Sequence, residues 1–206
     1  MTARGFTVSL AMVLALAVTG SGMVRADALA LGGSIPKAAT KMKNVDGKEV
    51  SIADVAGQKG TLVIFTCNAC PYVKAWQDRI VDLGNSYLSR GVGAIAVNSN
   101  DPSIVAEDSY DVMKDRATKS KMGFPYVVDA DSELATAFGA TRTPEAFLFD
   151  AGGKLVYHGT IDDNHKDADK VTKTYLKDAL EAVVGGNTVP VAETKALGCS
   201  IKFKKA

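Results

Sequence analysis

Two short apolar runs, each bounded by turn-forming residues, predict a pair of buried β-strands at Thr61–Thr66 and Val92–Val97. Between these runs the apolar positions recur at steps of three and four residues, at Val73, Trp76, Ile80, Leu83 and Tyr87. That spacing predicts an amphipathic helix with one buried stripe, which begins after Pro71 and ends near Gly91.

The rest of the chain continues the alternation of strands and helices. Asp46-Gly47, within residues 42–52, and the stretch 150–153 each indicate a hairpin. We expect further helices over residues 108–122, 132–138 and 171–184, and further strands over 126–128, 145–149 and 154–157. Residues 98–108 and 162–169 are polar and predict loops. Buried strands that alternate with helices predict an α/β fold, and the last hairpin makes the central sheet mixed.

The N-terminal pattern differs from that of the domain. Arg4 is followed by an apolar run over 8–18, and Val24-Arg25-Ala26 ends on a small residue. This order predicts an export signal over residues 1–26, because the apolar run is short for a membrane span of about 20 residues. An uncleaved membrane anchor is the alternative. We expect a flexible lead-in over 27–38, one domain over 39–186 and a C-terminal tail over 187–206.

Charge gives little information about partners. The 206 residues contain 24 Lys and Arg against 23 Asp and Glu, which is a net charge of +1. Cleavage after Ala26 would remove Arg4 and Arg25 and change the balance to 22 − 23 = −1. A near-neutral chain gives no reason to expect nucleic acid as a partner. Export has more consequence, because a cysteine pair can persist as a disulfide outside the cytosol.

The candidate chemistry lies at the end of the first buried strand, where Cys67 and Cys70 stand immediately before the predicted helix. Strand, Cys-x-x-Cys and helix in this order favour a redox site. The free N–H groups and the dipole of a helix start stabilise an anion, and a thiolate at Cys67 would be such an anion. A structural disulfide and a metal site are the two alternatives for this pair.

Four further side chains or clusters enter as candidates. The third cysteine, Cys199, could fold back to the pair as a redox thiol or be buried as an apolar side chain. His158 or His165 could join the cysteines around zinc or copper, although nothing in the spacing requires it. The carboxylates at 162–163 could hold a hard cation, but a capped, solvated turn is the expected reading.

The order of elements and the motifs FTCNACPYVK, Thr143-Pro144 and GKLVYHGTIDD resemble the thioredoxin-like superfamily over roughly residues 33–185. The chain is most similar to its redoxin branch, the exported relatives of alkyl hydroperoxide reductase/thiol-specific antioxidant proteins. This resemblance implies a three-layer fold with a central mixed sheet flanked by helices. It also implies that Pro144 follows a cis peptide bond and that Thr143 aligns the chain of a partner.

The resemblance implies an exported thiol–disulfide oxidoreductase, periplasmic or secreted, that acts on protein thiols or disulfides with a separate electron donor or acceptor. In this hypothesis Cys67 is the more exposed thiol and attacks the partner, and Cys70 resolves the mixed disulfide. We expect no cofactor, no resident metal, no membrane attachment after cleavage, and a monomer. A thiol peroxidase and a metal-binding or metallochaperone protein are the alternatives.

The chain departs from the patterns of these families at three places. Thr66 stands where thioredoxin has Trp before the pair, and residues 61–66 contain no acidic side chain to act as a buried carboxylate. The Pro-x-x-x-Thr/Ser-x-x-Cys motif of peroxiredoxins fits neither Cys67 nor Cys70. The missing motif weighs against a peroxidase of the usual design.

Overall fold

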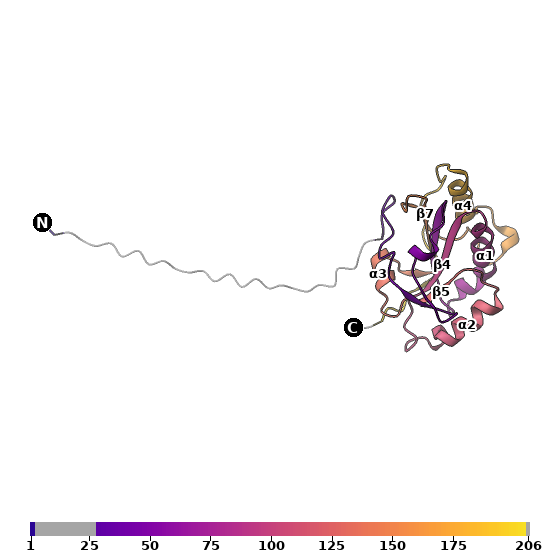
Figure 1. Cartoon of the computed structure of the whole chain (residues 1–206), viewed down its shortest axis with the longest axis horizontal. Coiled ribbons are helices and arrows are strands. Elements are labelled where there is room, and N and C mark those ends of the chain that lie inside the picture. Colours follow the sequence, from indigo (N-terminus) through magenta and orange to yellow (C-terminus); the bar gives the residue numbers. More distant parts are fainter. Residues whose placement is uncertain (3–27, 205–206) are drawn as a thin grey trace.

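The structure is a computed structural model that describes residues 1–2 and 28–204. Its centre is a seven-stranded sheet in the order β2-β1-β5-β4-β3-β7-β8 (Figure 1). The strands of this sheet are β1 (Met42–Asn44), β2 (Glu49–Val50), β3 (Gly60–Phe65), β4 (Val92–Asn98), β5 (Tyr126–Val128), β7 (Glu145–Asp150) and β8 (Leu155–Gly159). The export signal expected over residues 1–26 lies outside the described residues apart from its first two positions.

Within residues 28–204, four α-helices and three short 3-10 helices surround the sheet. The α-helices are α1 (Pro71–Leu88), α2 (Tyr110–Lys119), α3 (Glu133–Phe138) and α4 (Tyr175–Gly185). The 3-10 helices are η1 (Ala53–Val55), η2 (Ala106–Asp108) and η3 (Ala168–Lys170). A second, two-stranded sheet joins β6 (Arg142–Thr143) to β9 (Cys199–Ser200).

The central sheet is mixed, as the sequence predicts. On one side β3 runs parallel to β4, with Ile64 opposite Ala96. On the other side β3 runs antiparallel to β7, with Ile64 opposite Ala146. Because β3 lies between these two strands and every one of its residues is buried, its chain end has a fixed position from which α1 departs.

Each face of the sheet has its own apolar core, because successive strand residues point to opposite faces. Leu62 and Ile64 face the layer formed by α1, α2 and α4, while Val63 and Phe65 face α3. Figure 1 shows the strands between α3 on one side and α1 and α2 on the other. The three-layer architecture is therefore confirmed.

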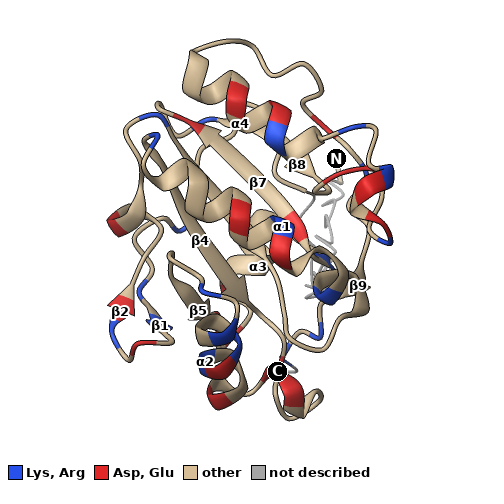
Figure 2. Cartoon of the chain, turned by 90° about the vertical axis from the view of Figure 1, so that its right-hand side faces the viewer, with Lys and Arg blue, Asp and Glu red and all other residues tan. Residues whose placement is uncertain are grey.

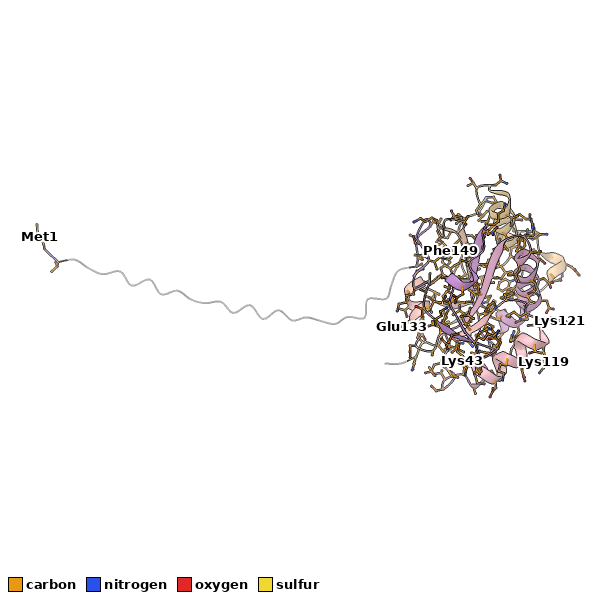
Figure 3. All side chains as sticks on the ribbon, viewed as in Figure 1. Met1, Lys43, Lys119, Lys121, Glu133 and Phe149 are labelled. Carbon is orange, nitrogen blue, oxygen red and sulfur yellow. The ribbon has the colours of Figure 1, made fainter. Side chains whose placement is uncertain are left out.

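Side chains fill the space between these layers, as Figure 3 shows. Phe149, which is labelled there, is fully buried in the core beside α3. Lys119 and Lys121 are exposed at the end of α2. Basic and acidic side chains are both scattered over several elements (Figure 2). No helix within residues 1–2 and 28–204 is long and apolar enough to cross a membrane.

Two helix boundaries bear on the site. The helix predicted after Pro71 begins at that residue and ends at Leu88, and Gly91 follows with a φ of 87°. The last helix begins at Tyr175, four residues later than predicted. The preceding segment is held outside the helix because Thr172 hydrogen-bonds the carboxylate of Asp163 through its N–H and its hydroxyl.

Both segments that flank the predicted domain are attached to it. Near the N-terminal end of the described region, Leu29 donates its backbone N–H to Phe138 at 3.0 Å. In the tail, backbone hydrogen bonds join His158 N–H to Ala192 at 3.0 Å and Thr194 N–H to His158 at 2.9 Å. The tail therefore follows the free edge of β8 before it reaches β9.

Candidate active site

The two cysteines occupy the turn between β3 and α1. After β3 ends at Phe65, Thr66 donates its backbone N–H to Val97 of the neighbouring strand at 2.8 Å. Cys70 is the N-cap residue of α1, and Pro71 is the first residue of that helix. A proline is well tolerated there, because the N–H it lacks would have no partner inside the helix. The helix therefore begins after Cys70, which places Cys70, and not Cys67, at its N-terminal end.

The turn between the cysteines is fixed through Asn68, which is buried. The backbone N–H of Asn68 donates to the carboxylate of Asp108, and its side-chain N–H donates to the carbonyl of Glu107 at 2.8 Å. Its side-chain oxygen accepts from the Tyr126 hydroxyl at 3.1 Å, and its carbonyl accepts from Arg116 at 2.8 Å. Four neighbours thus hold the position of the residue that follows Cys67.

Asp108 is the buried carboxylate that sequence analysis did not find. It lies in η2, in the stretch predicted as a polar loop, and is 3% exposed. Its second carboxylate oxygen accepts from the side chain of Asn100 at 2.7 Å. The sequence offered one signal, a carboxylate at the first residue of the predicted second helix, but only the tertiary fold brings it beneath Asn68.

Thr143 contacts both sulfurs from the opposite side. The peptide bond between Thr143 and Pro144 is cis, as the resemblance implies. The Cys67 sulfur lies 3.2 Å from the Thr143 hydroxyl oxygen, and the Cys70 thiol donates to the Thr143 carbonyl at 3.1 Å. The structure thus brings together all four residues that the sequence singled out for this site: two cysteines, the threonine and the proline.

The exposure of the cysteines differs from the sequence expectation. Cys67 is 1% exposed and Cys70 is 3% exposed, so the expectation that Cys67 is accessible is wrong. Cys199 is partly buried and packs against the cluster of Cys67, Cys70 and Val73. It reaches this place because β9 pairs antiparallel with β6, with Cys199 opposite Thr143. All three cysteines of the chain are free thiols.

The two cysteines of the pair have opposite acidities. The pKa of Cys70 is lowered to about 4, first by a hydrogen bond from the Cys67 thiol and then by the Cys199 thiol and the Val73 N–H, against the effect of burial. The pKa of Cys67 is raised by its contact with Cys70, by burial and by the charge of Asp108. Of the two sulfurs, Cys70 is therefore the more acidic, chiefly because the Cys67 thiol hydrogen-bonds to it.

The histidines do not join the cysteines. His158 is buried, and a hydrogen bond of 2.7 Å joins its Nε2 to Glu145 Oε1. His165 packs against the ring of Tyr72, with 4.5 Å between the ring centroids. Within the part of the chain that the structure describes, no group of three His, Cys, Asp or Glu side chains is arranged to hold a metal ion.

The carboxylates at 162–163 lie in a capped turn, as expected, but one of them is not solvated. Asp162 is buried and not solvated, because it accepts from the Trp76 indole N–H at 2.8 Å and pairs with Arg79. It also accepts the backbone N–H of Asn164 at 2.9 Å, which caps the turn. Trp76 is fully buried on the apolar stripe of α1, as predicted.

Comparisons with known proteins agree with this arrangement. The thiol-disulfide oxidoreductase ResA of Geobacillus thermodenitrificans (strain NG80-2) is 26% identical over 158 residues, which cover 76% of this chain and 79% of that protein. A match to the ResA of Halalkalibacterium halodurans spans 61% of the length of that protein.

Two solved structures show the fold. The crystal structure of an uncharacterized conserved protein from Geobacillus kaustophilus has a TM-score of 0.81 and 38% identity, and covers 86% of this chain and 94% of that one. The solution structure of a thioredoxin-like protein in its oxidized form has a TM-score of 0.60 and 19% identity, and covers 75% of this chain and 96% of that one. The fold is thus thioredoxin-like.

The Redoxin family matches residues 30–176, a range that includes both cysteines of the pair and Thr143-Pro144. Since this match takes in more than half of the sequence and the fold agrees with it, the chain belongs to the Redoxin family.

Proposed function

We propose that the protein is an exported thiol–disulfide oxidoreductase in which Cys67 and Cys70 alternate between two thiols and one disulfide. The observation that carries this proposal is the position of two adjacent sulfurs at the strand–helix junction, both in contact with Thr143. The names of the ResA relatives describe the same reaction class. The substrate is a protein dithiol or disulfide, and a separate protein or small molecule supplies or accepts the electrons.

The chemistry balances without a cofactor. When a partner dithiol is oxidised, its two sulfurs join in one disulfide, the bond between Cys67 and Cys70 breaks, and two electrons pass to this pair. Of the two protons of the partner dithiol, Cys67 takes up one and the solvent the other, and Cys70 is left as the thiolate because its pKa is lowered to about 4, chiefly by the Cys67 thiol. The resemblance implies that Thr143, just before Pro144, aligns the chain of a partner, and in this structure β9 pairs with Thr143.

Export and oligomeric state are part of the proposal. The pattern over residues 1–26 supports cleavage after Ala26, which would release a monomeric protein into an oxidising compartment. N-terminal sequencing of the protein recovered outside the cytosol is expected to begin at Asp27. Recovery of the protein inside the cell with residues 1–26 still attached would contradict the proposed cleavage and export.

Cysteine variants test the activity. Cys67→Ser and Cys70→Ser are each expected to oxidise a reduced, unfolded model protein far more slowly than wild type, because either change prevents the disulfide between Cys67 and Cys70. Val191→Ser, at an exposed position of the tail, is the matched control and is expected to keep the wild-type rate. Unchanged turnover in both cysteine variants would overturn the proposal.

The peroxidase alternative has its own readout. A thiol peroxidase forms sulfenic acid rapidly when hydrogen peroxide is added in less than equimolar amount. We expect no such rapid product, because the sequence lacks the Thr/Ser-x-x-Cys arrangement at both cysteines. Rapid sulfenic acid at Cys67 or Cys70 would replace the oxidoreductase proposal by a peroxidase.

A further inference from the structure

The C-terminal tail occupies the strand position beside the redox pair. Cys199 and Ser200 of β9 pair antiparallel with Thr143 and Arg142 of β6, and the N–H of Ile201 donates to the Thr141 carbonyl at 3.0 Å. Thr143 is the residue that contacts both sulfurs of the pair. A segment of this same chain thus lies along the strand that a partner would use.

The approach of the tail is close. A Cβ at Gly198 would lie 2.0 Å from the Thr143 carbonyl oxygen, so only glycine fits at this position with the tail in place. Beyond β9 the tail is held again, because Asp101 donates its N–H to the Lys202 carbonyl at 2.8 Å and Lys202 donates its N–H to Asn100 Oδ1 at 2.8 Å. The tail is therefore a fixed part of the site and not a loose cover.

This arrangement restricts which sulfur a partner can touch. Cys67 and Cys70 are 1% and 3% exposed, whereas Cys199 is only partly buried. Cys199 at the same time packs against the pair. Of the three cysteines, it is the one that reaches both the solvent and the buried sulfurs.

We propose that Cys199 is a third redox residue of this site, which exchanges with the partner and connects it to the buried pair through a disulfide with Cys70. This inference rests on the proposed function, which supplies the disulfide between Cys67 and Cys70. The partner is a protein dithiol that presents one thiolate to Cys199 from the solvent. The opposite direction, reduction of a partner disulfide, uses the same steps in reverse.

The steps balance. First, the Cys199 sulfur attacks the Cys70 sulfur, the bond between Cys67 and Cys70 breaks, and the proton of Cys199 passes to Cys67. Second, a thiolate of the partner attacks Cys199, and Cys70 leaves as a thiolate. Third, the second thiol of the partner attacks the partner sulfur that is bound to Cys199. This forms the disulfide of the partner, breaks the mixed disulfide and returns Cys199 as a thiol.

The acidities favour the second step, in which Cys70 leaves. The pKa of Cys70 is lowered to about 4, chiefly by the Cys67 thiol, and a thiol of low pKa is the better leaving group. The pKa of Cys199 is raised to about 11 by burial and by its contact with Cys70. Cys199 is therefore released as a neutral thiol once the product has formed.

A trapping experiment tests the connection. In the Cys67→Ser variant, mild oxidation with diamide is expected to give an intramolecular disulfide between Cys70 and Cys199, identified by peptide mapping. In the Cys70→Ser variant the remaining pair, Cys67 and Cys199, is expected to form little disulfide under the same conditions. Absence of the Cys70–Cys199 disulfide in Cys67→Ser would overturn the inference.

A kinetic experiment tests the role. Cys199→Ser is expected to oxidise a reduced, unfolded model protein about tenfold more slowly or worse than wild type, equivalent to about 1.4 kcal/mol of barrier. Val191→Ser, in the same tail, is the control. An equal or faster rate in Cys199→Ser would overturn the inference. It would mean that the partner displaces the tail and reacts directly with Cys67 or Cys70.

The two proposals fail in different ways. If wild type is active and Cys199→Ser is equally active, the proposed redox role of Cys199 is wrong, whereas the proposed function of Cys67 and Cys70 is unaffected. If wild type is no faster than Cys67→Ser and Cys70→Ser, the oxidoreductase function itself is wrong. The trapping experiment does not depend on turnover, so it decides the connection even if Cys199→Ser folds poorly.

Discussion

The acidity of Cys70 combines a hydrogen bond from the Cys67 thiol with a position at the start of α1. Cys70 is the N-cap of α1 and its pKa is lowered first by the Cys67 thiol and less by the Val73 N–H, whereas Cys67 lies outside the helix and its pKa is raised by Cys70, by burial and by the charge of Asp108. An anion is stabilised where unpaired backbone N–H groups meet. Pro71 keeps Cys67 outside the helix, because a helix that included Cys67 would need an N–H that proline lacks.

The contribution of the Cys67 thiol to the low pKa of Cys70 can be tested. Its hydrogen bond to Cys70 is the largest influence that lowers the pKa of Cys70 to about 4. In Cys67→Ala this donor is lost, so the pKa of Cys70 is expected to rise clearly, whereas Cys67→Ser keeps an O–H donor and is expected to raise it less. Thiolate absorbance followed against pH measures the midpoint. Equal midpoints in the two variants would contradict this role of the donor.

At the scale of elements, local patterns predicted the helices and strands of the central sheet but not the short strands of the second sheet. The stripe of Trp76 and Ile80 predicts α1, and the run at Thr61–Thr66 predicts β3 to within a residue. β6 and β9 have two residues each and no periodicity, and they pair across more than fifty positions of sequence. Such a pairing is set by tertiary packing, and the burial of Asp108 was missed for the same reason.

The pairing of β9 with β6 can be broken at one position. In Gly198→Ala the new Cβ would lie 2.0 Å from the Thr143 carbonyl oxygen, so the two strands must separate. Crowding of this kind costs typically about 1–3 kcal/mol. We expect lower stability in urea and faster alkylation of Cys67 and Cys70, measured by peptide mapping after iodoacetamide treatment.

The control for this variant is another glycine-to-alanine change. In Gly152→Ala the Cβ would meet only an Asp150 side-chain oxygen, at 3.3 Å, so a small effect is expected. If alkylation of the pair is as slow in Gly198→Ala as in Gly152→Ala, β9 does not control access to the sulfurs.

At the scale of the whole molecule, the acidity of the site is coupled to folding. A thiol whose pKa is lower in the folded chain than in the unfolded chain stabilises the fold wherever the folded form alone is ionised. For Cys70 this range extends from about 4, the value set mainly by the Cys67 thiol, to 9.0, the ordinary value of a cysteine. The reduced protein therefore gains stability from this thiolate, and oxidation to a disulfide removes that contribution.

The sign of the pH dependence follows from proton binding. Between pH 5 and pH 8 the unfolded chain keeps the Cys70 proton and the folded chain does not, so the free energy of unfolding rises with pH by up to about 1.4 kcal/mol per unit. Above pH 9 the trend reverses, because Cys67, whose pKa is raised by Cys70 and burial, stays protonated only in the folded chain. Urea unfolding of the reduced protein, with Cys70→Ser as the reference, measures the difference, since all other groups are common to both. A difference that does not grow from pH 5 to pH 8 would mean that the Cys70 thiolate contributes nothing to the stability of the reduced fold.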